Sequence, residues 1–90
     1  MTIKQTAGSD SMGEFAPEFA YLNDDILFGE VWNRDALLPI KLRSIATISA
    51  LIGKSIVDSS LAYHLQSARN NGVAKSEMAE VLAHIAFYAG

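Results

Sequence analysis

The feature that most constrains the fold is an apolar segment from Leu38 to Gly53, LPIKLRSIATISALIG. Its large aliphatic side chains recur every three or four residues, and Ile40 and Ala50 widen the stripe that they form: Leu38, Leu42, Ile45, Ile48, Leu51 and Ile52. A helix that is apolar over so much of its circumference is usually central in its domain. The β-branched residues make a strand arguable, but a length of about 14 residues favours a helix, with Pro39 in its first turn and Gly53 at its end.

An earlier helix is predicted to begin at Pro17, because proline suits the first helical position, where its missing N–H group costs nothing. Phe19, Leu22 and Ile26 follow at spacings of three and four, which places them on one face of that helix. Gly29 is expected to loosen or end the helix.

Capping residues delimit two further helices. Asp58 or Ser59 can cap a helix over 58–71, and the NNG sequence at 70–72 ends it, since Asn and Gly tolerate the left-handed conformation. A last helix follows from about Lys75, so these two helices are expected to form a tight antiparallel hairpin. No segment alternates apolar and polar residues with a period of two. The sequence therefore predicts a small all-α domain built around this hairpin.

The size of the chain favours one domain that associates with copies of itself. Its 90 residues include a polar stretch over 1–14, predicted to be an N-terminal arm, which leaves 15–90 as the helical domain. Half of the residues are hydrophobic and none is cysteine, so disulfides cannot support a core this small. Burial of apolar surface between subunits is the remaining common remedy, and a homo-oligomer is expected.

Charge and hydropathy argue against several classes of function. The formal net charge is −3 and the basic residues form no cluster, which disfavours nucleic-acid binding. No apolar run approaches the roughly 20 residues of a membrane-spanning helix, and the N-terminus lacks the apolar centre of a signal peptide. A cytoplasmic protein without a membrane or nucleic-acid partner is predicted.

Three side chains suited to acid–base chemistry lie near the C-terminus: His64, Glu80 and His84. Glu80 and His84 are four residues apart on one helical face, so the carboxylate can hold the imidazole and raise its basicity. His64 lies about eight residues before the NNG turn and Glu80 about eight after it, which gives them similar heights in an antiparallel pair. The spacing predicts one pocket shared by all three side chains.

Plainer interpretations of these residues stay open. A Glu–His pair four residues apart is commonly a solvated surface pair, and His64 can be a packing residue. Two histidines and a carboxylate are a known metal-ligand set, but there is neither an HExxH motif nor a closely spaced histidine pair, and no metal is expected. The serines lack the context of a nucleophile elbow.

Arg43 is a further candidate, early in the central helix and among apolar neighbours. Its structural role would be an ion pair with Glu77, Glu80 or the end of another helix. Its functional role would be bidentate binding of a substrate carboxylate. The structural role is favoured, and substrate binding is kept as the functional hypothesis.

Three stretches of the chain, taken in order, are APEF, FGEVWNRDALLPIKLRSIATISALI and HLQSARNNGVAKSEMAEVLAHIAFYAG. Together they resemble the cysteine-free branch of the carboxymuconolactone decarboxylase family. The shared series is an apolar helix opened by an R-S pair, a histidine, an A-x-x-N-G turn, an E-x-x-E helix start and a terminal Y-x-G. The resemblance covers nearly all of the chain from about residue 14.

The resemblance implies a fold similar to alkylhydroperoxidase D, assembly as trimers or hexamers, and decarboxylation of a lactone dicarboxylic acid without metal or organic cofactor. It implies that His64 is the family histidine before the N-G turn and Glu80 the acidic residue of the last helix. His84 falls where thiol-using relatives have a cysteine or a polar residue. Those relatives reduce peroxides with a C-x-x-C pair, and the absence of cysteine excludes that chemistry here.

Two departures from the family pattern affect these expectations. Ala74 stands where the family usually has Thr, whose cap at the helix start is worth roughly 1 kcal/mol. The chain also stops at AFYAG, where the family generally continues through a proline into another helix. The alternative therefore stays open that the sequence is a fragment lacking that helix.

Two functions are weighed. The first is cofactor-free decarboxylation of, or proton transfer on, a small carboxylated lactone or similar acid. His64 would be the general acid, Glu80 would orient an imidazole, and His84 or Arg43 would bind a carboxylate. The alternative is a non-catalytic oligomeric helical module that binds a small ligand or accompanies another enzyme. A concave pocket that gathers the three acid–base residues favours the enzyme, whereas separate exposed side chains favour the module.

The apolar excess predicts that the purified protein is a homo-oligomer, a trimer or a dimer of trimers, because its apolar surface needs a partner. Light scattering at micromolar concentration should give a mass about three or six times that of one chain. A stable monomer under these conditions would contradict the prediction.

Overall fold

A computed structural model describes residues 5–89, except for the side chain of Met12. The described residues form helices and no strand, which confirms the all-α fold class. The elements are α1 (Ala7–Met12), α2 (Pro17–Tyr21), the π-helix η1 (Leu22–Val31), α3 (Ile40–Gly53), α4 (Ser59–Asn70) and α5 (Lys75–Tyr88). They group into two compact units, one ending at Leu38 and the other beginning at Pro39.

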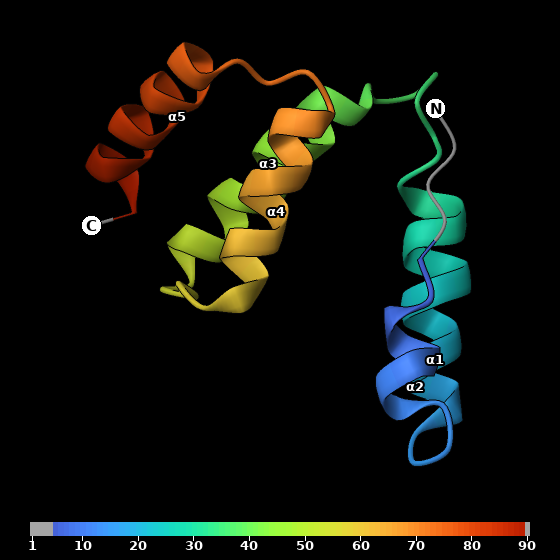
Figure 1. Ribbon diagram of the computed structural model, residues 1–90. Coiled ribbons are helices and arrows are strands. Elements are labelled where there is room, and N and C mark those ends of the chain that lie inside the picture. Colours follow the sequence, from blue (N-terminus) through green and yellow to red (C-terminus); the bar gives the residue numbers. More distant parts are fainter. Residues whose placement is uncertain (1–4, 90) are drawn as a thin grey trace. The chain divides into compact units, whose positions relative to one another are not determined.

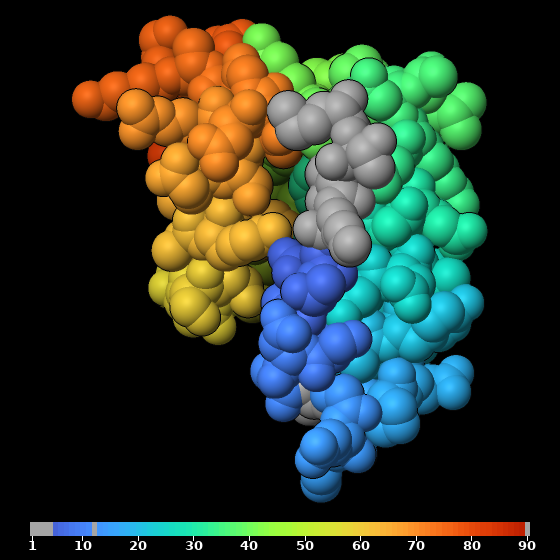
Figure 2. All heavy atoms as spheres, turned by 45° about the vertical axis from the view of Figure 1, so that its right-hand side comes forward, coloured from blue at the N-terminus to red at the C-terminus, as the bar shows by residue number. Residues whose placement is uncertain are grey.

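In the first unit, α1 lies against α2 and η1 (Figures 1 and 2). The buried carboxylate of Asp24 joins them: the Gly8 amide donates to its Oδ1 at 2.9 Å and the Ser9 amide to its Oδ2 at 2.8 Å. A Cβ at Gly8 would lie 2.8 Å from the Asp24 Oδ1 and 3.1 Å from the Cα of Ala20. Glycine therefore permits the close approach on which this contact depends.

The helix predicted at Pro17 does begin there, but it buries a different face from the one expected. The buried residues recur at every fourth position: Ala20, Asp24, Phe28 and Trp32. Phe19 and Leu22 are about half exposed. The rings of Phe28 and Trp32 stack with centroids 5.9 Å apart. The helix continues in π form past Gly29 to Val31, with the amide of Trp32 bonding the Leu27 carbonyl five residues back.

The segment expected to be an N-terminal arm contains regular structure. Residues 7–12 form α1, where the polar sequence had suggested none. The polar residues of α1 give no apolar periodicity. The helix is held instead by the hydrogen bonds of its Gly8 and Ser9 amides to Asp24, which lies sixteen and fifteen positions later. Residues 1–4 lie outside the described part of the chain, and the division at residue 14 stays a prediction.

The second unit is built on α3, whose bounds agree with the prediction. Ile48 is fully buried and forms a core cluster with Ala68 and Val73. Partly buried side chains surround this cluster: Ile45, Ile52, Leu61, Leu65 and Met78. The hydroxyl groups within α3 are satisfied along the helix itself, where Ser44, Thr47 and Ser49 donate to carbonyls four residues earlier.

The antiparallel hairpin is formed by different helices from the pair predicted. Figure 1 shows α3 and α4 running side by side in opposite directions, and α5 also packs on α3. The expected tight pair of α4 with α5 is wrong, because the cluster around Ile48 draws both helices onto α3. An ion pair between Lys41 on α3 and Glu77 on α5, at 2.8 Å, adds to the second contact.

Two turns close the helices of this unit. After α4, Gly72 adopts a φ of 97°, and the amides of Gly72 and Val73 bond the carbonyls of Arg69 and Ala68, as the NNG sequence predicts. α3 ends with the same bond pattern, but there Ser55 adopts the left-handed conformation, with a φ of 61°. The stop signal of α3 therefore lies two residues beyond Gly53, which is itself the last helical residue.

Ser55→Gly is expected to raise the free energy of unfolding by about 0.5–1 kcal/mol, because glycine has no Cβ to strain at positive φ. Thermal or denaturant unfolding measures the change. Ser49→Gly, the same substitution inside α3, is the matched control and should destabilise the protein. Loss of stability in both variants would contradict the left-handed assignment.

Asp24→Asn is expected to detach α1 from its neighbours. Burial raises the pKa of Asp24, but hydrogen bonds from Asn23, Ser9 and Gly8 together lower it to about 2. A carboxyl group with a depressed folded-state pKa stabilises the fold above its ordinary pKa, and this contribution is lost as the pH falls from about 4 through about 2.

Amide hydrogen exchange tests the Asp24 contact directly. In Asp24→Asn, or in the parent protein at a pH near 2, the Gly8 and Ser9 amides should lose protection. The Val73 amide bonds the Ala68 carbonyl in the other unit and serves as the internal control. Equal loss of protection at all three amides would show global unfolding and contradict a local role.

Candidate functional site

His64 is the most enclosed of the proposed acid–base residues. It lies on α4 beside Leu65, which packs on the core, and its Nδ1 atom is shielded from solvent. The Tyr63 ring meets the His64 ring edge to face, with centroids 5.0 Å apart. Burial lowers the pKa of His64 below its ordinary value of 6.5, so the ring is mostly neutral at pH 7.

His84 lies near the end of α5 and is exposed at one side of a cavity of about 490 Å³. The ring of Tyr88, one turn later, has its centroid 5.0 Å from that of the His84 ring, and the two ring planes are inclined by 32°. The end of α3 supplies another wall of the cavity through Ser49 and Gly53. The hydroxyl group of Ser49 donates to the Ile45 carbonyl at 2.8 Å, so its proton is already engaged.

Glu80 is exposed on α5, and the neighbouring carboxylate, Glu77, makes the strong contacts. The Glu77 carboxylate accepts hydrogen bonds from Lys41 and from the Ala74 amide, and these lower its pKa. The Ala74 bond is half of a capping box, since alanine has no side-chain oxygen to complete it. Arg43, on α3, is partly exposed, and its Nε atom is shielded from solvent.

The structure does not support the reasoning by which His64 and Glu80 were predicted to lie at similar heights along a helical hairpin. That argument needed direct pairing of α4 with α5, whereas each helix packs on α3. His84 lines a cavity with α3, but neither His64 nor Glu80 lines that cavity. A pocket shared by the three residues stays a prediction.

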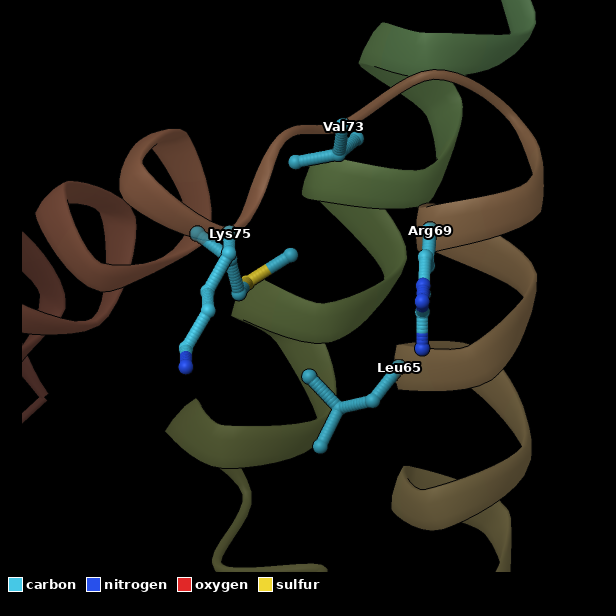
Figure 3. Close-up of a pocket in the computed structure, with 5 residues that line it drawn as sticks. Leu65, Arg69, Val73 and Lys75 are labelled. Carbon is cyan, nitrogen blue, oxygen red and sulfur yellow. The ribbon is translucent and has the colours of Figure 1, made fainter.

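A second cavity, also of about 490 Å³, lies between α4 and the start of α5 (Figure 3). Its apolar lining comes from Leu65, Val73 and Met78, which also belong to the core cluster or pack against it. Its charged lining comes from Arg69 and Lys75. No motif in the sequence marks these two cations, although both lie within a few residues of the NNG turn.

Two other kinds of feature are absent from the described part of the chain. Within residues 5–89, no three or more His, Cys, Asp or Glu side chains gather as metal ligands would. None of the described helices has the length and apolar character needed to cross a bilayer.

Comparison with known proteins decides the family. The model of the family described as "Carboxymuconolactone decarboxylase family" matches residues 17–90, beginning at the first residue of α2. The chain belongs to the carboxymuconolactone decarboxylase family. The resemblance inferred from the ordered motifs is thereby confirmed.

The chain is also similar to a curated protein. The 4-carboxymuconolactone decarboxylase of Acinetobacter baylyi (strain ATCC 33305 / BD413 / ADP1) is 36% identical over 81 residues. The match covers 90% of this chain but only 59% of the relative's length. No solved structure matches the chain.

Proposed function

We propose that this member of the carboxymuconolactone decarboxylase family is a carboxy-lyase acting on a small carboxylated lactone or similar acid, without metal or organic cofactor. The observation that carries the proposal is that His64, which the resemblance suggests is the family histidine, is half-buried on α4. An imidazole held neutral by burial near neutral pH can gain and donate a proton within one catalytic cycle.

Decarboxylation requires one proton at carbon. The bond between the ring carbon and its carboxylate breaks, CO2 leaves, and the electron pair enters the conjugated carbonyl as an enolate. A general acid then protonates carbon, and the proton is replaced from solvent. Because an opposite charge raises the pKa of an imidazole, binding of the carboxylate substrate would favour protonation of His64. The proton would then be taken up together with the substrate.

The other proposed residues serve binding and orientation. Glu80 would orient an imidazole, as a carboxylate does when it accepts a hydrogen bond from the ring. His84 or Arg43 would bind a substrate carboxylate, and Arg43 offers a bidentate fork for this purpose. His84 has the support of a cavity beside it that is large enough for a small ligand.

The proposed setting is a cytoplasmic homo-oligomer, a trimer or hexamer, with neither nucleic acid nor a membrane as partner. None of the residues of α5, all of which the structure describes, is fully buried, and Leu82 and Phe87 are exposed. An apolar helix with so little cover in one chain is suited to a contact between subunits. Such a contact would also bring acid–base residues of different chains together.

The alternative, a non-catalytic oligomeric helical module that binds a small ligand or accompanies another enzyme, has its own support. Glu80 and His84 are exposed, as a solvated surface pair would be. The chain also spans only 59% of the relative's length, so the relative's reaction need not be retained.

His64→Gln is expected to lower turnover of a carboxylated lactone by about 10²–10⁴-fold while leaving the melting temperature and subunit count nearly unchanged. Glutamine keeps the polar character of the side chain but cannot donate a proton at neutral pH. Steady-state kinetics and thermal unfolding, measured on one preparation, test both parts. Gln66→Ala, an exposed change on the same helix, is the control.

The opposite pattern would assign His64 to packing. In that case, His64→Gln should destabilise the protein by about 1 kcal/mol or more, because it leaves a buried polar partner unmatched. Turnover per folded molecule would then equal that of the Gln66→Ala control. That result would contradict the proposed role of His64.

A further inference from the structure

The cavity between α4 and the start of α5 combines an apolar interior with two cations. Leu65, Val73 and Met78 line it, and Val73 is only 4% exposed. The side chains of Arg69 and Lys75 project from different helices and stand apart from each other in Figure 3. A volume of about 490 Å³ falls within the range of small-molecule pockets.

Neither cation is neutralised by the described part of the protein. Within residues 5–89, Arg69 and Lys75 make no ion pair or side-chain hydrogen bond, in contrast to Lys41, whose ammonium group bonds Glu77. The chain carries ten acidic and seven basic residues, so carboxylates are not scarce. Two cations beside an apolar cavity, both without a carboxylate partner there, leave an excess of positive charge at its edge.

We propose that this cavity binds a small organic dianion, a molecule with an apolar body and two carboxylate groups. The apolar body would contact Leu65, Val73 and Met78, and each carboxylate would meet one of the two separated cations. Arg69 can bind a carboxylate through two parallel hydrogen bonds, whereas Lys75 acts as a point charge. The side chains suit dicarboxylates of the size of a single aromatic ring.

This site does not depend on the proposed decarboxylase activity. None of His64, Glu80 and His84 lines the cavity. A dicarboxylate bound there would contact other side chains than these three, as a second ligand of the protein. Binding can therefore be measured without turnover, and its failure would leave the role of His64 untouched.

Terephthalate, benzoate and succinate form a matched set of probes. Terephthalate has the ring and two carboxylates, benzoate lacks one carboxylate, and succinate lacks the ring. In a titration of the full chain at low salt, followed by amide resonances, terephthalate should bind at least about fivefold tighter than either of the others. The shifted resonances should cluster at Leu65, Val73 and Met78.

Charge-removing variants test the two cations. Arg69→Gln and Lys75→Gln are each expected to weaken terephthalate binding about fivefold, towards the affinity for benzoate, because each removes one carboxylate partner. Lys54→Gln removes the same charge from an exposed position outside both cavities and should leave the affinity nearly unchanged. His64→Gln should leave it unchanged as well, which separates this site from the proposed catalytic residue.

Three results would overturn the proposal. Equal weakening by Lys54→Gln would show diffuse electrostatic attraction, and equal binding of succinate and terephthalate would show that the apolar lining contributes nothing. A changed subunit count in Arg69→Gln or Lys75→Gln, with no resonance shift on addition of terephthalate, would show that a second copy of the chain occupies the cavity.

Discussion

Contact of Ile48 with Ala68 and Val73 is the interaction on which the second unit depends. Ile48 and Ala68 have no exposed surface, and Val73 has almost none. These residues belong respectively to α3, to α4 and to the turn that leads into α5, so one small cluster fixes all three elements. Truncation of a fully buried isoleucine typically costs several kcal/mol, a large share of the stability of a domain this small.

A polar link ties the same turn to α3. The Asn71 amide group donates to the hydroxyl oxygen of Ser44 at 3.0 Å, and that hydroxyl donates to the Ile40 carbonyl. Ser44 is 1% exposed, so the hydroxyl is buried with both a donor and an acceptor satisfied. Because Arg69 and Lys75 lie on either side of this turn, the link also fixes the positions from which the two cations reach their cavity.

Local signals in the sequence predicted the ends of helices well. Pro17, Pro39, Asp58 and the NNG sequence act on the backbone within one turn, and each marks the boundary that the structure shows. Signals that depend on tertiary contact failed. α1 is held by Asp24 from outside its own segment, and the hairpin partner of α4 is chosen by the cluster around Ile48. A helix with apolar residues on several faces does not reveal in its sequence which face a neighbour will cover.

The candidate site was predictable to a similar extent. The family could be inferred from ordered motifs, and the structure adds that His64 is partly enclosed. The height of His64 relative to Glu80 could not be predicted, because that inference combined a correctly predicted turn with a wrongly predicted pair of helices. Arg69 and Lys75 carried no motif. Only the structure shows that both line one cavity together with apolar side chains.

The two cavities lie at opposite ends of α5. Lys75 and Met78 at its start line one cavity, and His84 and Tyr88 at its end line the other. Glu77 lies at the start of α5, where its carboxylate bonds Lys41 of α3 and also completes the first turn of α5 through the Ala74 amide. One carboxylate thus holds the start of the helix both internally and against α3. The cationic cavity is built around this anchored end, whereas His84 lies two turns beyond it, on the part of α5 where Leu82 and Phe87 are exposed.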